Sequence, residues 1–165
     1  MATDMFLDFE KEEGLEGESA DVKHAGTIEI SSWGTSYEQP MSPAKTATGP
    51  SVERCKAEPI TIAKIMDATT PGLLKRIWGG KLIPKGTIYC YRADDAGKPV
   101  LYLKIEMLHI LVTTYSLSGA EGDIPQEEVG LSVGQVTFHY DVQKKEGGGT
   151  GAKKAQCNFI TGKID

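Results

Sequence analysis

The chain has 165 residues, a length typical of one domain with one core. Its formal net charge of −5 argues against nucleic-acid binding, which requires clustered positive charge. Hydrophobic residues make up 39% of the sequence and 19 residues are glycine, a composition that favours a β protein with many turns over a deep-cored enzyme. We therefore expect residues 1–165 to form a single, mainly β domain.

The first part of the chain predicts short strands separated by polar turns. Met5–Phe9 alternates in hydrophobicity and predicts a strand with one polar face, and Thr27–Ser36 predicts a second strand. Residues 40–51 contain prolines, a glycine and small polar residues without strand alternation, so a long exposed loop is expected, either functional or disordered. Val52–Ile62 resumes an extended pattern.

One helix is expected at about residues 70–78. Thr70 is the predicted N-cap, Pro71 occupies the first helical position, and Gly79-Gly80 supplies a left-handed stop. The predicted apolar stripe consists of Leu73, Leu74, Ile77 and Trp78. A helix this short is not stable alone, so the stripe is expected to form a helix–barrel core, with Trp78 inside it.

The second part of the chain predicts longer strands. Thr87–Arg92 and Val100–Ser116 predict a hairpin joined at Asp94–Gly97, and the apolar run of its second strand predicts cover on both faces, by the helix on one side. Glu127–Tyr140 and Ala155–Ile164 predict further strands. Together these elements predict a closed or nearly closed β-barrel of two antiparallel sheets, with the helix packed on its side.

Cysteine use and hydropathy indicate where the protein resides. Cys55, Cys90 and Cys157 are scattered without a C-x-x-C motif, so reduced thiols are expected rather than a disulfide framework. The N-terminus Met1–Gly14 is acidic and lacks an apolar core, so we expect no cleavable signal peptide. Charged residues interrupt the most apolar run, Leu101–Val112, so no membrane insertion is expected.

The sequence contains no convincing catalytic or metal-binding pattern. His24, His109 and His139 are isolated, without the spacing of metal ligands, so neither a metal nor a cofactor is expected. Ser19 and Asp21 lie close to His24, but a working triad needs side chains aimed at one point beside an oxyanion hole. A turn with local hydrogen bonds is the preferred interpretation, and we expect a protein that is not an enzyme.

Several stretches in register resemble one family, Hcp (hemolysin-coregulated protein), the tube subunit of the bacterial type VI secretion system. The stretches that carry the resemblance are Gly17–His24, Ser32–Gly34, Asp67–Leu74, Tyr102–Val112, Glu127–Leu131 and Gln135–Tyr140. They follow one another in the family's order over essentially the whole chain.

The resemblance implies a β-barrel with one flanking helix and a long protruding loop, at about residues 40–51. Copies of this barrel would form a homo-hexameric ring that stacks on further rings into a tube. A contractile sheath would drive this tube out of the cell behind a VgrG spike, with effector proteins in the lumen. The protein would reside in the bacterial cytoplasm before firing and then be secreted to the medium or a target cell. Ser32 is a candidate lumen residue. The candidate ring-stacking loop is Met41, Ser42, Pro43, Ala44, Lys45 and Thr46.

Two questions stay open at the level of sequence. The runner-up function is a secreted β-barrel effector that binds a small ligand or hydrolyses a substrate, which would need a pocket with convergent polar groups. Ring closure by head-to-tail contacts requires two different complementary patches on each subunit. The strand edges around Met5–Phe9 and Val129–Val133 are the candidates for these patches.

Overall fold

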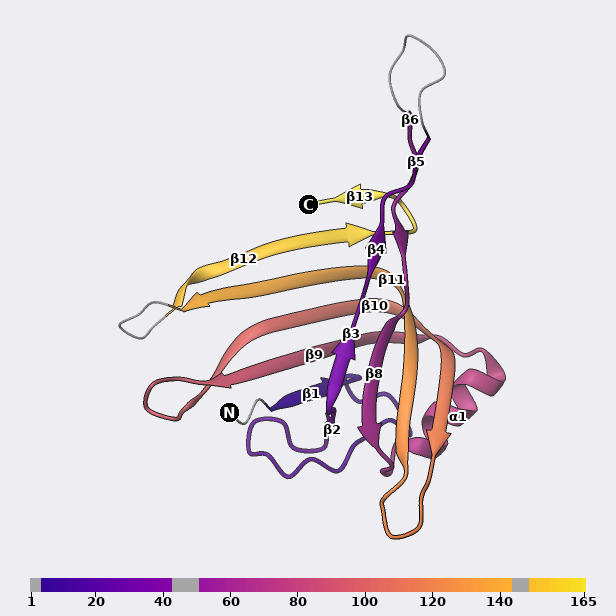
Figure 1. Cartoon of the computed structure of the whole chain (residues 1–165), viewed down its shortest axis with the longest axis vertical. Coiled ribbons are helices and arrows are strands. Elements are labelled where there is room, and N and C mark those ends of the chain that lie inside the picture. Colours follow the sequence, from indigo (N-terminus) through magenta and orange to yellow (C-terminus); the bar gives the residue numbers. More distant parts are fainter. Residues whose placement is uncertain (1–3, 43–50, 144–148) are drawn as a thin grey trace.

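Antiparallel pairing joins most strands into one continuous sheet, and a computed structural model describes residues 4–42, 51–143 and 149–165 (Figure 1). The predicted mainly β architecture is confirmed. The strands are β1 (Met5–Asp8), β2 (Ile28–Glu29), β3 (Ser32–Gly34), β4 (Tyr37–Glu38), β5 (Met41–Ser42), β6 (Ser51–Val52), β7 (Lys56–Ala57), β8 (Ile60–Ile65), β9 (Ile83–Ala93), β10 (Pro99–Ser118), β11 (Gln126–Gln143), β12 (Gly149–Asn158) and β13 (Lys163–Ile164), and the helix is α1 (Thr70–Gly79).

Strand β11 belongs to two sheets because it changes partner along its length. Its first residues pair with β8, with Val129 opposite Ile62, whereas its later residues pair with β12, with Phe138 opposite Ala155. Strand β10 runs beside β11 throughout. The long sheet therefore has the order β13-β12-β11-β10-β9-β1-β2, and the short sheet has the order β3-β8-β11-β10.

A corner between the two sheets forms where β10 and β11 bend. His109 has a left-handed φ of 55° in the middle of β10, and Gly134 lies opposite it on β11. A Cβ on Gly134 would lie 3.0 Å from the His109 Cβ, so the close approach requires glycine. The corner changes which side chains of β10 face the core. Before His109 the buried residues are the odd-numbered Ile105 and Met107, and after it they are the even-numbered Ile110 and Val112.

This change of phase corrects one prediction. The apolar run of β10 was expected to be covered on both faces, but fully buried residues still alternate on each side of His109. The run looks continuous in the sequence because the buried positions move from odd to even numbers at the corner. The hairpin prediction is confirmed, since Gly97 donates its N–H to the carbonyl of Asp94 at 2.9 Å.

The two sheets curve toward each other into a nearly closed barrel, as predicted. The remaining gap, between β2 and β3, has no strand ladder. Here Ile30 donates its N–H to the Met5 carbonyl at 3.1 Å, and Ser31 donates to the Ala63 carbonyl at 2.8 Å. Two backbone bonds from consecutive residues therefore hold the edges together. The core inside consists of buried aliphatic residues, among them Leu7, Ile28, Ile62, Ile88 and Leu131.

Helix α1 lies beside β10, at the part of the short sheet that β9 does not reach (Figure 1). Its bounds agree with the prediction, and Gly80 ends it in the predicted left-handed conformation, donating its N–H to the Arg76 carbonyl. The N-cap is Thr69 rather than Thr70. The Asp67 carboxylate already accepts the Thr69 N–H at 2.9 Å, so the chain enters the helix one residue earlier.

The predicted helix–barrel core is correct in part. Leu73 is fully buried, and Leu74 and Ile77 are half-buried, but Trp78 is 77% exposed, so its assignment to the core is wrong. At about 100° per residue, Trp78 lies about 140° around the helix from Leu73 and outside the covered face. Arg76 is buried instead, because its guanidinium donates to the Glu12 carboxylate at 2.7 Å and to the Leu82 carbonyl at 3.3 Å.

Candidate assembly surface

A two-stranded arm extends the short sheet beyond the rest of the molecule. The pairs β3–β8, β4–β7 and β5–β6 follow one another as one long, interrupted hairpin. Figure 1 shows the outermost pair, β5–β6, projecting past β12 and β13. We define the arm as residues 37–42 and 51–57. Residues 41, 42 and 51 of the predicted loop at 40–51 lie in the paired strands β5 and β6, and residues 43–50 lie outside the described residues.

The arm presents apolar side chains to solvent. Met41 is 66% exposed and pairs across the arm with Val52, which is 70% exposed. A methionine beside a valine, both in water, is the kind of patch that protein interfaces cover. The importance of Val52 was missed from the sequence, because it is set by cross-strand register. Of the other predicted stacking residues, Ser42 pairs with Ser51, whereas Pro43, Ala44, Lys45 and Thr46 lie outside the described residues.

Aromatic rings fix the base of the arm to the long sheet. The Tyr37 ring stacks on Phe159, with ring centroids 6.1 Å apart, and meets Phe138 edge to face at 6.5 Å. Phe138 comes from β11, and Phe159 follows β12 directly. These contacts hold β4 against the face of the long sheet, so the arm leaves the barrel in a defined direction.

A free strand edge lies on β12 rather than at the predicted positions. Strand β1 is paired on both sides, with β9 and β2, and Val129 and Leu131 of β11 are buried between β8 and β10. Both predicted edges are therefore wrong. In the described chain, residues 149–155 of β12 pair with β11 alone, and β13 covers β12 only from Cys157 onward.

The candidate lumen residue Ser32 is exposed on β3.

A buried ion-pair network lies at the end of the short sheet, close to the start of α1. Lys64 is fully buried and donates to Glu127, its direct cross-strand partner, and to the Asp67 carboxylate at 2.8 Å. The Tyr115 hydroxyl donates to Glu127, and burial together with that carboxylate raises the pKa of Tyr115. The sequence contained a signal for this buried network. Lys64 and Glu127 each lie two residues from a buried apolar residue of their own strand, so alternation directs both side chains toward the core.

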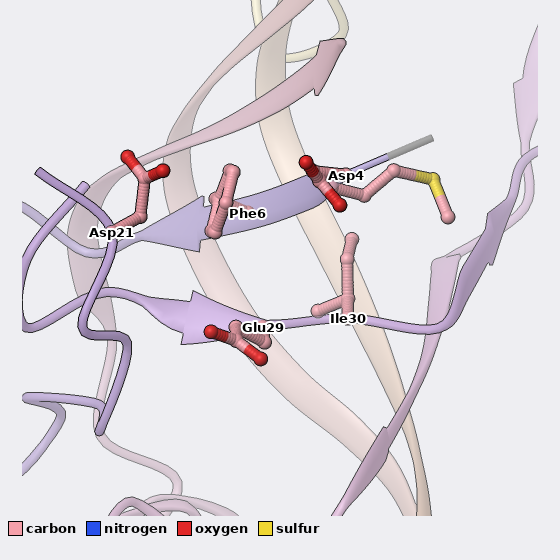
Figure 2. Close-up of a pocket in the computed structure, with 6 residues that line it drawn as sticks. Asp4, Phe6, Asp21, Glu29 and Ile30 are labelled. Carbon is pink, nitrogen blue, oxygen red and sulfur yellow. The ribbon is translucent and has the colours of Figure 1, made fainter. Parts of the chain in front are cut away.

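Three carboxylates surround an acidic hollow of about 340 Å³ at the β1–β2 end of the long sheet. Figure 2 shows Asp4, Asp21 and Glu29 around the rings and aliphatic atoms of Phe6 and Ile30. The carboxylates do not converge on one point. Among the described residues, no three His, Cys, Asp or Glu side chains are placed so that together they could hold a metal ion.

The stretch from Ser19 to His24 is a turn with local hydrogen bonds, which confirms the interpretation made from the sequence. The Asp21 carboxylate accepts the backbone N–H of Lys23 at 2.8 Å and that of His24 at 3.0 Å. The His24 ring stacks on Phe6 and lies 2.6 Å from the Tyr91 hydroxyl through Nε2, whereas the Ser19 hydroxyl accepts the backbone N–H of Asp21. Its burial lowers the pKa of His24. These three residues do not form a triad.

Comparison with known proteins shows the family. The family model described as "Type VI secretion system effector, Hcp" matches residues 6–140. The chain belongs to the Hcp family. Hcp proteins are tube subunits that type VI systems secrete, so this chain is a structural subunit that assembles with copies of itself. A search of curated proteins gave no significant match.

Solved Hcp structures resemble the chain over nearly its full length. Hcp1 from Salmonella typhimurium is 28% identical with a TM-score of 0.79, and the match covers 100% of both chains. Hcp2 from the same organism is 26% identical with a TM-score of 0.70, over 97% of this chain and 98% of its own. A structure described as a type six secretion system protein reaches a TM-score of 0.87 at 24% identity, over 99% of this chain and 100% of its own.

The Hcp fold accounts for the geometry of the arm and the barrel together. The barrel holds the core, and the arm and the β12 edge are two features of the described chain that leave apolar or backbone groups open to solvent. Among the described residues, no helix combines the length and apolar character needed to cross a bilayer.

Proposed function

We propose that this Hcp-family chain forms hexameric rings, and that the arm stacks one ring on the next to build the tube. The observation that carries the stacking role is the exposed Met41–Val52 pair on an arm that projects beyond the rest of the subunit. Six arms per ring multiply a weak apolar contact, because the later contacts form within an already docked pair of rings.

The free edge of β12 is the proposed contact within a ring. Its residues 149–155 present unpaired N–H and C=O groups that a neighbouring chain can engage by adding a strand. A closed ring built from identical contacts must join this edge to a different patch on the next subunit. The inner wall of the ring, with Ser32 as a candidate, would then face the effector proteins carried in the lumen.

The remaining partners follow from the tube role. A VgrG spike would cap the tube, and a contractile sheath would surround it and expel it from the bacterial cytoplasm. We propose no catalytic activity for the chain. The acidic hollow lacks a nucleophile with an adjacent base, and the His24 turn satisfies its own hydrogen bonds. The tube role is therefore favoured over a ligand-binding or hydrolytic effector.

Size-exclusion chromatography with light scattering, supported by negative-stain images, tests ring formation. We expect a particle with about six times the mass of one chain and an open centre. Stacking is tested separately with the double variant M41S/V52S and with deletion of residues 41–48. Rings should persist in both, while tubes should shorten or disappear.

A matched control separates the arm from surface hydrophobicity in general. Val22 is also exposed, on the turn before β2, so V22S removes an apolar side chain far from the arm. Tube length should be unchanged in V22S. Tubes of normal length in M41S/V52S and in the deletion would refute stacking by the arm, and a monomer at every accessible concentration would refute self-sufficient ring formation.

A further inference from the structure

Two cysteines far apart in the sequence share a hollow under the base of the arm. Cys55, next to β7, and Cys157, on β12, both line a cavity of about 380 Å³ together with Tyr37, Phe138 and Phe159. All three cysteines of the chain are free thiols. No local sequence pattern associates these two cysteines, because their shared cavity depends on how the arm lies on the long sheet.

Strand geometry places Cys157 on the face of the long sheet that the arm covers. Cys157 lies opposite Val136, and Ala155 lies opposite Phe138, so these four side chains share one face. Tyr37 of the arm contacts Phe138 on that same face and stacks on Phe159, two residues beyond Cys157. The Cys157 thiol is therefore directed at the base of the arm.

The cavity lining places Cys55 on the side of the arm that faces the long sheet. Tyr37 is paired with Ala57 of β7, and Cys55, which immediately precedes β7, lines the same cavity as Tyr37. The thiol donates to the Lys56 carbonyl at 3.7 Å, and Cys55 remains open to solvent. Burial chiefly raises the pKa of Tyr37, and both thiols add smaller effects in the same direction, as expected for groups around one hollow.

We propose that Cys55 and Cys157 are a redox pair whose reversible disulfide fastens the base of the arm to β12. The third cysteine, Cys90, is fully buried in the barrel core and takes no part. A disulfide needs Cα atoms within about 7 Å and thiols that point toward each other, and the shared cavity is the observation that places both thiols between the arm and the long sheet. The bond would hold the arm at one angle when the protein leaves a reducing compartment for an oxidising one.

The oxidant is a low-molecular-weight disulfide, such as oxidised glutathione. The exposed Cys55 thiolate attacks one sulfur of that disulfide, a mixed disulfide forms, and one glutathione leaves as its thiol after taking up a proton. The Cys157 thiolate then attacks the Cys55 sulfur, and the second glutathione leaves. The two cysteines lose two electrons and two protons, and oxidised glutathione is reduced to two thiols. Burial raises the pKa of the Cys157 thiol, which favours Cys55 as the first attacking group.

Intact-mass spectrometry of the full chain in oxidised glutathione tests the proposal. The wild type should lose the mass of two hydrogen atoms and retain no glutathione, and peptide mapping should link Cys55 to Cys157. C157S should stop at a stable glutathione adduct on Cys55, C55S should form no such link, and C90S should behave as the wild type.

The experiment also distinguishes bonds within a chain from bonds between chains. In a mixture of isotopically labelled and unlabelled protein, the linked peptides should come from one chain only. Linked peptides of mixed isotopic origin would overturn the proposal. So would a wild type that retains glutathione on Cys55 as C157S does, or a wild type that does not react.

Proteolysis measures the consequence for the arm. Arg54 and Lys56 are exposed beside Cys55, so trypsin can cut the arm when its backbone opens locally. Cleavage at these two sites should be several-fold slower in the disulfide form than in the reduced form, and oxidation should not change the rate in C157S. Equal rates in the oxidised and reduced wild type would mean that the arm is not fastened.

Discussion

Tyr37 on the arm and Phe159 after β12 stack with an interplanar angle of 18°, and this contact joins two parts of the chain that share no strand ladder. The direction of the arm is therefore set by side-chain packing as well as by the hairpin beneath it. A stacked aromatic pair contributes about 0.5–1.5 kcal/mol beyond the area it buries, enough to orient a ribbon without making it rigid.

Removal of the Tyr37 ring should loosen the arm more than it destabilises the barrel. We expect Tyr37→Ala to lower the free energy of unfolding by less than about 2 kcal/mol, because the side chain is 43% exposed. Hydrogen exchange in β4 and β7 should become faster. Tyr140→Ala is the control, since Tyr140 is also 43% exposed but lies on β11. Equal exchange in the two variants would contradict the role of the stack.

The helix prediction can be tested by truncating one residue on each of its faces. Leu73→Ala should lower the free energy of unfolding by about 3–5 kcal/mol, because it leaves a cavity at a fully buried position. Trp78→Ala should change it by less than about 1 kcal/mol, because the indole lies in solvent. Denaturant titration of purified protein measures both. A large loss in Trp78→Ala alone, at concentrations where rings form, would place the indole in a subunit contact.

The buried network should couple Lys64 to Glu127. Removal of one partner leaves an unpaired buried charge, so Lys64→Met and Glu127→Leu should each cost about 3–5 kcal/mol. The double variant should cost less than the sum of the two, because both charges are then absent. A double-mutant cycle measures the coupling. Additive losses would show that the two side chains act independently.

His24 should make the fold less stable in mild acid. Its folded-state pKa is lowered from the ordinary value of 6.5, chiefly by burial, so the unfolded chain binds the proton more readily. Its contribution to stability is therefore fully present above pH 6.5 and is lost as the pH falls through the folded-state pKa.

The measurement compares the wild type with His24→Phe. The phenylalanine keeps a ring against Phe6 but cannot titrate. The drop in unfolding free energy between about pH 7.5 and about pH 5 should be smaller in the variant. An identical pH dependence would assign the acid sensitivity to other groups, such as the paired carboxylates.

Local signals in the sequence predicted much of the fold. Pro71 and Gly80 mark the helix, Asp94 and Gly97 mark the hairpin turn, and strand alternation gave the order of the elements. Contacts between distant segments were not predictable in this way. The burial of Arg76 depends on its ion pair with Glu12, and the free edge of β12 depends on the partner change of β11.

The candidate site shows the same division between local and distant information. Met41 was named from its place in a protruding segment, which is a local property. Its partner Val52 and the shared hollow of Cys55 and Cys157 follow from register and from the packing of the arm, which no short stretch of sequence encodes.

The corner at His109 and Gly134 has a mechanical consequence. Because β10 and β11 pass through it unbroken, the two sheets have no hinge between them, and relative motion must shear the hydrogen bonds of both strands at once. A thrust applied to the long sheet reaches the short sheet along covalent backbone. A subunit built this way transmits an axial force without bending at the corner. Any deformation of the assembly then occurs at the contacts between neighbouring copies.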